Sequence, residues 1–161
     1  MIILNLSQKE CMSHLLLEQT FDHFSLIKAE IKTFNTFEID GFINQEFFDA
    51  PVDDDFSKWS DIRKFCLSII RGKRTPLDFM IVFSLRKCEI PQFLAANQLA
   101  GFSPADIKGL YLNLKYDGRS LSCTTGTSLS LFTLDKSLEQ AWDQTVIDFF
   151  KTNAISYEIP V

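Results

Sequence analysis

The stretch L-K-Y-D-G-R-S-L, residues 114–121, places Asp117-Gly118 between apolar strand residues. An Asp-Gly pair suits the positive φ angles of a tight hairpin, so the stretch predicts two antiparallel strands joined at this point. The same pair occurs as Asp40-Gly41 in T-F-E-I-D-G-F-I-N, residues 36–44, and predicts a second hairpin.

Strand patterns surround these turns. A strand is expected at residues 25–34, because residues 27–32 alternate apolar and charged side chains, which is typical of an antiparallel sheet with one dry and one wet face. Residues 77–85, L-D-F-M-I-V-F-S-L, are apolar on both faces over most of their length, so this strand is expected to be central and covered by helices or another layer. Further strands are expected at residues 2–6, 110–116 and 156–159.

Four amphipathic helices are expected between the strands. The first opens with a capping box formed by Ser7 and Glu10. The second follows Asp53-Asp54-Asp55, whose carboxylates would favour the positive end of a helix dipole. The third runs from Pro91 to Gly101. The fourth carries an apolar stripe from Leu138 to Phe150, with Thr133 or Asp135 as its N-cap.

Size and composition indicate one domain. The 161 residues are 46% hydrophobic and 23% charged, and sixteen of them are Phe. A chain of this length removes roughly 70% of its unfolded surface from water, so it needs no disulfide or metal to hold a core. We therefore expect a single α+β domain over residues 1–161, with a mostly antiparallel, twisted sheet of seven or eight strands.

The order of helix, Asp-Gly pair, Trp-led helix and strand occurs twice, about half a chain apart. W-S-D-I-R-K-F at Trp59 compares with W-D-Q-T-V-I-D-F-F at Trp142. An internal duplication would place two α+β halves around a pseudo-two-fold axis, whereas chance similarity of amphipathic helices explains the same pattern.

Charge and cysteine usage limit the location and the partners. The net charge of −5 and the pI near 5.0 argue against a general affinity for nucleic acid or anionic membranes. No apolar run approaches the ~20 residues that span a bilayer, and the N-terminus lacks the features of a signal peptide. The four cysteines include no C-x-x-C pair, so we expect reduced thiols in a cytoplasmic protein.

The hydroxyl-rich run C-T-T-G-T-S-L-S-L-F-T-L-D-K-S, residues 123–137, allows two interpretations. A phosphate loop needs a helix N-terminus directly behind its glycine, and here several strand-like residues follow Gly126 first. The run therefore predicts a turn between strands in which Gly126 supplies a positive φ.

The segment R-G-K-R-T-P, residues 71–76, is the best candidate for a ligand site. With Arg63 and Lys64 it places five cations within twelve residues of an acidic chain. Cations at a helix C-terminus also complement the helix dipole without any ligand. The anion-site hypothesis requires the cations and the threonines of the hydroxyl-rich run to share one pocket; its residues are Arg71, Lys73, Arg74, Thr124, Thr125 and Thr127.

No catalytic, metal or cofactor site is predicted. His14 and His23 have no nucleophile whose pairing the sequence specifies. Asp53-Asp54-Asp55 lacks the spacing of a calcium loop. The spacing of Thr133 and Lys136 lacks the other elements of an acyl-transfer site.

Several strings together resemble an uncharacterised family of small cytoplasmic bacterial proteins, found mainly in Gram-positive anaerobes. They are F-N-T-F-E-I-D-G, W-S-D-I-R, G-K-R-T-P-L-D-F, L-N-L-K-Y-D-G and C-T-T-G-T-S-L-S-L-F-T-L-D-K-S-L-E-Q-A-W-D. The resemblance covers nearly the whole chain and implies one self-contained domain of unknown function, without any activity or catalytic residue.

Three functions follow as hypotheses. The first is a non-enzymatic binding or regulatory module that acts through a protein partner or a second copy of itself. The second is a phosphate-ligand or nucleotide-related protein that uses the anion site. The third, nucleic-acid binding, requires the basic segment to join Lys28 and Lys32 in one stripe.

Overall fold

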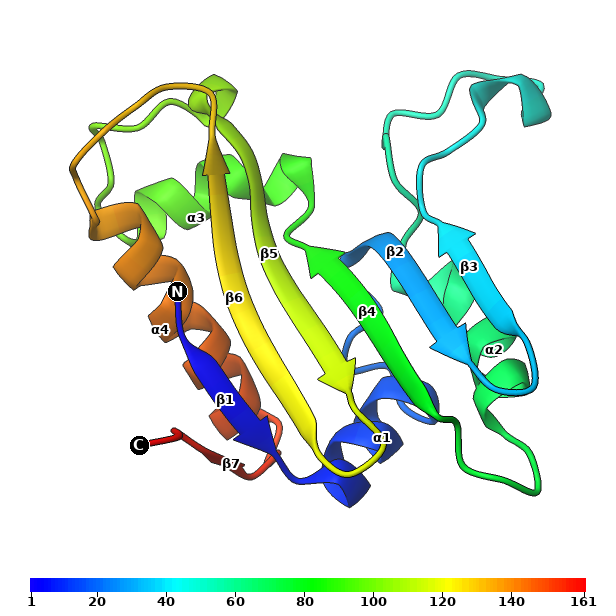
Figure 1. Ribbon diagram of the computed structural model, residues 1–161. Helices are drawn as coiled ribbons and strands as arrows, with labels where there is room; N and C mark the ends of the chain where they lie inside the picture. Colours follow the sequence, from blue (N-terminus) through cyan, green and yellow to red (C-terminus); the bar gives the residue numbers. More distant parts are fainter.

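The computed structural model describes residues 1–161. Seven strands form one antiparallel sheet with the strand order β3-β2-β4-β5-β6-β1-β7 (Figure 1). The strands are β1 Ile3–Leu6, β2 Ser25–Lys32, β3 Thr36–Asp40, β4 Asp78–Ser84, β5 Ile107–Tyr116, β6 Leu121–Leu129 and β7 Tyr157–Glu158. The helices are α1 Gln8–Leu16, α2 Trp59–Ile70, α3 Ile90–Ala96 and α4 Ser137–Thr152. The expected single α+β domain with four helices is confirmed.

The long β5–β6 hairpin lies near the middle of the sheet, and its turn is the predicted Asp117-Gly118. Gly118 has a φ of 95°, which favours glycine. The Asp117 carboxylate accepts the backbone N–H groups of Arg119 and Ser120, each at 2.9 Å. Pairing then continues along both strands from Tyr116–Leu121 to Ile107–Leu129.

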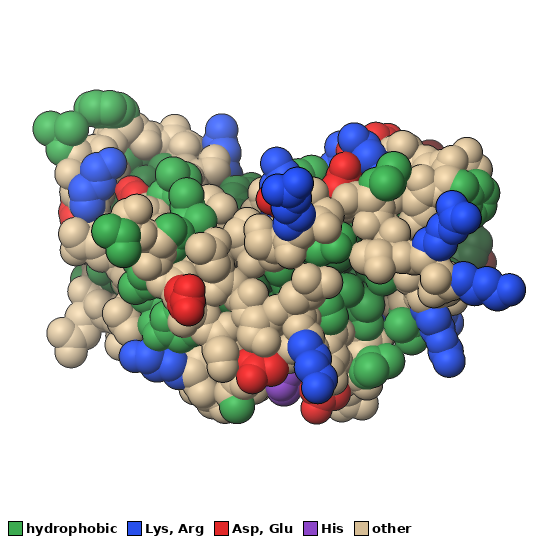
Figure 2. Space-filling view, turned by 60° about the horizontal axis from the view of Figure 1, so that its bottom comes forward, with side chains coloured by type: hydrophobic (Ala, Val, Ile, Leu, Met, Phe, Trp, Pro, Cys, Tyr) green, Lys and Arg blue, Asp and Glu red, His purple; other side chains and the backbone are tan.

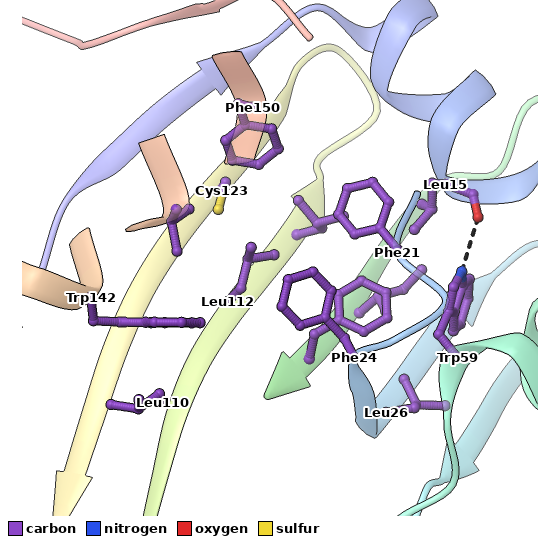
Figure 3. Packing of buried hydrophobic residues seen from close by; sticks show 14 of the residues in the cluster. Leu15, Phe21, Phe24, Leu26, Trp59, Leu110, Leu112, Cys123, Trp142 and Phe150 are labelled. Carbon is purple, nitrogen blue, oxygen red and sulfur yellow. Dashed lines mark hydrogen bonds between the residues drawn. The ribbon is translucent and has the colours of Figure 1, made fainter. Parts of the chain in front are cut away.

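The core lies on the face of the sheet that the helices cover (Figure 1). Trp59 of α2 and Trp142 of α4 are both almost completely buried there. Each indole N–H donates to a backbone carbonyl, Trp59 to Leu15 at 2.9 Å and Trp142 to Tyr111 at 2.8 Å. Figure 3 shows the Phe21 and Phe24 rings lying between the two indoles. Because both polar groups are satisfied, the large aromatic rings are buried without an unpaired donor.

The opposite face of the sheet is uncovered. β4 is central and covered by helices, as predicted, but the helices cover only one of its two faces (Figure 1). Met80 and Val82 point away from the buried side chains of β4 and are half-exposed. Lys28 and Lys115 lie beside them on the neighbouring strands, and the stems of such long side chains shield apolar neighbours from water.

The predicted Asp40-Gly41 hairpin is wrong. The β2–β3 turn lies earlier, where the Thr33 N–H donates to the Asn35 carbonyl at 2.9 Å. Gly41 follows the end of β3 and its N–H donates to Ile27 at 2.9 Å, so it extends the contact with β2. Its φ is not positive. Strand pairing here overrides the local preference of the dipeptide.

The hydroxyl-rich run is also not a turn. Residues 121–129 form the continuous strand β6, and Gly126 lies within it opposite Tyr111 without a positive φ. Pairing with β5 over its whole length satisfies the strand, so the glycine bends nothing.

Helix ends differ from the sequence expectation at α2 and α3 and agree with it in part at α4. α2 begins after Lys58 and not at the three aspartates, which lie farther upstream. α3 ends at Ala96, before Gly101, because Gln98 takes the left-handed φ of 55°. At α4 the formal N-cap is Lys136, but the Asp135 carboxylate accepts the Ser137 N–H at 2.9 Å and so caps this end.

Half of the predicted capping box forms at α1. The Ser7 hydroxyl accepts the Glu10 N–H at 3.4 Å, whereas the Glu10 carboxylate accepts the Ser156 N–H at 2.7 Å. This hydrogen bond lowers the pKa of Glu10. Glu10 thus ties the start of α1 to the C-terminal segment.

The two halves of the chain repeat their order of elements but not their strand pairing. The strand after the first Trp-led helix, β4, pairs with β2 and β5. The strand after the second, β7, pairs with β1 at the far edge of the sheet. This difference favours chance similarity of the helices over duplication.

Candidate binding surfaces

An arm of residues 42–57 leaves the sheet after β3 and returns before α2, at the upper right of Figure 1. Its stem is closed by an isolated β-bridge between Phe42 and Phe56. The Ile43 N–H also donates to the backbone carbonyl of Asp55 at 2.8 Å. Farther out, the Gln45 side chain accepts the Val52 N–H and donates to the Val52 carbonyl, both at 3.2 Å. We call this segment the aromatic arm; it is a folded projection with its own cross-links.

Ion pairs anchor the arm to the body. Arg86 donates to both carboxylate oxygens of Asp54, at 3.2 and 3.1 Å, and Lys87 donates to Asp55 at 3.1 Å. Burial alone would lower the pKa of Arg86, but the hydrogen bond and charge of Asp54 raise it. The predicted role of these aspartates at a helix start is therefore replaced by a tether between the arm and the residues that follow β4.

The outer part of the arm exposes aromatic rings. Phe47 is 84% and Phe48 47% exposed, and the two rings meet edge to face with centroids 5.4 Å apart. The arm contains five carboxylates and no cation. Asp54 and Asp55 form the ion pairs just described, and the remaining three form none: Glu46, Asp49 and Asp53. The arm is therefore both apolar and acidic.

A second surface lies at the other end of the same strands, between the β2–β3 turn and the loop of residues 71–76. It is a groove of about 540 Å³ whose lining includes Phe34, Leu77 and the three predicted cations Arg71, Lys73 and Arg74. Figure 2 shows Lys and Arg side chains gathered at the right of this end of the molecule, with hydrophobic side chains beside them. None of the three cations forms an ion pair, and Phe34 is 87% exposed. We call this surface the basic groove.

The predicted threonines do not join these cations. Thr124 lies on the uncovered face of the sheet. Thr125 is buried, donates to Asp143 at 2.5 Å and accepts the Ile2 N–H at 2.9 Å. Thr127 lines a separate hollow of about 200 Å³ beside the start of α4. The structure therefore brings Arg71, Lys73 and Arg74 together and leaves the threonines outside the basic groove.

Other cations near the basic segment have structural partners. Arg63 forms a forked pair with Asp22, at 3.0 and 3.1 Å. Lys28 and Lys32 both pair with Glu30, at 3.6 and 3.9 Å. Because the carboxylate of Glu30 lies between the two lysines, they do not extend the basic groove into a continuous positive stripe.

Groups suited to metal binding or nucleophilic chemistry do not gather. No group of three or more His, Cys, Asp or Glu side chains could hold a metal ion. His14 contacts Thr20 at 2.7 Å and Glu18 at 3.1 Å. Burial raises the pKa of the Cys11 and Cys66 thiols to about 12, which disfavours the reactive thiolate. No helix has both the length and the apolar character needed to cross a membrane.

Residues 14–158 match a family of unknown function, DUF5721. The chain belongs to this family. No curated protein matches the chain, and no solved structure does. The match confirms the resemblance to a domain of unknown function.

Sequence reasoning missed Phe47, Phe48 and the Arg86–Asp54 pair. The one local signal for the arm is Q-E-F-F-D-A-P, residues 45–51, in which two adjacent Phe residues lie between carboxylates and precede a proline. Such a segment fits neither helical nor strand periodicity, and a polar segment without periodicity indicates a loop. The ion pair joins residues 32 positions apart and leaves no local signal.

Proposed function

We propose that this member of DUF5721 is a non-enzymatic protein-binding module whose docking surface is the aromatic arm. The observation that carries the proposal is the exposed Phe47–Phe48 pair on a folded, tethered projection. Exposed apolar patches with polar rims mark interaction sites in soluble proteins. A loop that served only as a connection would not need these rings or this tether.

Pre-organisation supports the docking role. Full burial of one Phe side chain in a partner's pocket contributes about 1.5–3 kcal/mol, and a rigid loop loses less conformational entropy when it binds. The unpaired carboxylates Glu46, Asp49 and Asp53 favour a partner with an apolar pocket and basic rim, because complementary charge steers association.

Site-specific photocrosslinking tests the proposal. The photoreactive residue p-benzoylphenylalanine replaces Phe47 in cells that express the protein natively, and the adducts are identified by mass spectrometry. Phe132, 89% exposed in the loop between β6 and α4 and outside the basic groove, is the matched control position. We expect discrete protein adducts from position 47 and none of these from position 132. The same adducts from both positions, or none from position 47, would contradict a docking role for the arm.

Because the threonines lie outside the basic groove, the second candidate function is a reduced form of the anion-site hypothesis, in which Arg71, Lys73 and Arg74 alone bind a phosphate-bearing ligand. The three unpaired cations around one groove support it, since guanidinium groups bind phosphate in forked geometry. A specific ligand raises the unfolding temperature by mass action, so thermal-shift screening with inorganic phosphate, nucleotides and sugar phosphates tests it. No shift with any of these compounds counts against it.

We further propose that the module acts in the cytoplasm and does not bind nucleic acid. The four cysteines are free thiols and three of them are buried, which fits a reducing compartment. The net charge of −5 and the paired Lys28 and Lys32 oppose electrostatic attraction to phosphate backbones. A labelled duplex or single strand should show no salt-dependent binding.

A further inference from the structure

The two surfaces of this chain complement each other. The aromatic arm has three unpaired carboxylates beside exposed Phe47 and Phe48. The basic groove has three unpaired cations beside exposed Phe34 and Leu77. Its volume of about 540 Å³ leaves room for apolar side chains from another surface. Opposite charge around matching apolar centres is the pattern expected of two surfaces that bind each other.

One molecule cannot join its own two surfaces. Thr33 and Phe34, which line the groove, precede β3, and the arm begins at Phe42, just past the other end of β3. The five residues of β3 place the surfaces about 17 Å apart along a rigid strand. Figure 1 shows the arm and the 71–76 loop at opposite ends of the sheet. The contact must therefore form between molecules.

The position of β3 determines how two copies can meet. β3 is the edge strand of the sheet and pairs only with β2, so its other edge is free. A two-fold rotation beside this edge exchanges its two ends, and each arm then faces the groove of the other copy. Two-fold dimers are the commonest oligomers because one surface serves both subunits.

We propose that the occupant of the basic groove is the aromatic arm of a second copy, in a two-fold dimer with the β3 edges facing each other. The inference deepens the proposed function, because it rests on the arm as docking surface and names its partner. Two identical contacts form at once, so each raises the effective concentration for the other. The pairing also covers an edge strand that would otherwise remain open to other chains.

Charge exchange tests the dimer. The groove variant carries Lys73→Glu and Arg74→Glu, and the arm variant carries Glu46→Lys and Asp49→Lys. Light scattering after size exclusion should give about twice the 18.5 kDa of one chain for the wild type and one chain mass for each variant. The chain with all four substitutions should again form a dimer, because both contacts regain opposite charges. A control with Lys9→Glu and Lys151→Glu has the same charge change as the groove variant on exposed helical positions outside both surfaces and should remain a dimer.

The outcomes separate this inference from the proposed function. Restoration by the fourfold variant supports the dimer, since a misfolded or merely weakened surface is not repaired by further substitution. A wild-type monomer at high concentration and low salt, or a fourfold variant that stays monomeric, overturns the dimer. Adducts of position 47 with other proteins would then still support the arm as a docking surface. Absence of any adduct would reject both.

Discussion

The two Asp-Gly pairs of this chain are the same dipeptide in different structures. Asp117-Gly118 closes the β5–β6 hairpin, and its glycine has a φ of 95°. Asp40-Gly41 marks the point at which the chain leaves β3 for the aromatic arm, and its glycine has no positive φ. Gly118 is required because its backbone has a positive φ. Gly41 is required because its surroundings leave no room for a side chain.

The space around Gly41 is bounded by two chain segments, strand β2 and the residues just before α2. Its N–H donates to Ile27 at 2.9 Å, and its carbonyl accepts the Ser57 N–H at 2.8 Å. A β-bulge between Leu26 and Lys28 moves the Leu26 carbonyl towards it, so an added Cβ would lie 1.7 Å from that oxygen. The arm therefore starts at a position where only the absence of a side chain lets the stem touch β2.

The largest expected effect in this comparison is that of Gly41→Ala. The new Cβ meets backbone atoms, which cannot rotate away as a side chain can, so the stem or β2 must shift. We expect a loss of about 3 kcal/mol in the free energy of unfolding, at the upper end of the cost of overpacking. Urea unfolding followed by circular dichroism measures it.

Gly101→Ala is the matched control, because an added Cβ there meets nothing within 4 Å. It should change the free energy of unfolding by less than about 0.5 kcal/mol. If Gly41→Ala were as mild as this control, the arm would not depend on the close approach at its base. Crosslinking from position 47 should weaken together with stability in the Gly41 variant.

Gly118→Ala should cost less, about 1–2 kcal/mol, because it forces an ordinary residue into the left-handed region. Asn tolerates that region better, so Gly118→Asn should lose less stability than Gly118→Ala. The order of the two variants in urea unfolding is the readout. Equal losses would indicate that the approach of an added Cβ to the Leu77 carbonyl, at 2.9 Å, decides the cost instead of φ.

This contrast also shows which parts of the fold the sequence could predict. Alternation and helical stripes act over a few residues, so the antiparallel sheet and all four helices were predictable. The path after Asp40 depends on the bulge in β2 and on Ser57, which are distant in sequence. The Asp-Gly dipeptide alone therefore gave the wrong prediction of a hairpin at this position. At the candidate sites, the cations of residues 71–74 were found because they cluster in sequence. Phe47 and Phe48 were missed because exposure, and not composition, makes them informative.

Removal of the turn carboxylate, Asp117→Ala, should have a smaller effect that depends on pH. Hydrogen bonds from the backbone of Ser120 and then Arg119 lower the pKa of Asp117 in the folded protein. A carboxylate whose pKa is lower in the folded than in the unfolded protein stabilises the fold at a pH above its unfolded pKa of about 3.9. This contribution is lost as the pH falls through the folded pKa.

The measurement compares urea unfolding of wild type and variant at about pH 7 and about pH 2. The difference in the free energy of unfolding between wild type and variant should be smaller at the lower pH. Asp40→Ala is the partner variant, because that carboxylate accepts only the Phe42 N–H, at 3.0 Å, and should give the smaller difference near neutral pH. A larger effect at position 40 would reverse the ranking of the two Asp-Gly pairs.

The smallest expected effect is that of Gly126→Ala, in the middle of β6. This glycine needs neither a positive φ nor close contact, since an added Cβ meets nothing within 4 Å. Glycine within a strand is less stable than alanine by about 0.5–1 kcal/mol, so the variant should unfold at a slightly higher urea concentration. A loss of stability, measured under the same conditions as for Gly41→Ala, would mean that the uncovered face of the sheet is occupied in solution. That result would contradict the open space around Gly126, because a methyl group that meets no other atom should not be unfavourable.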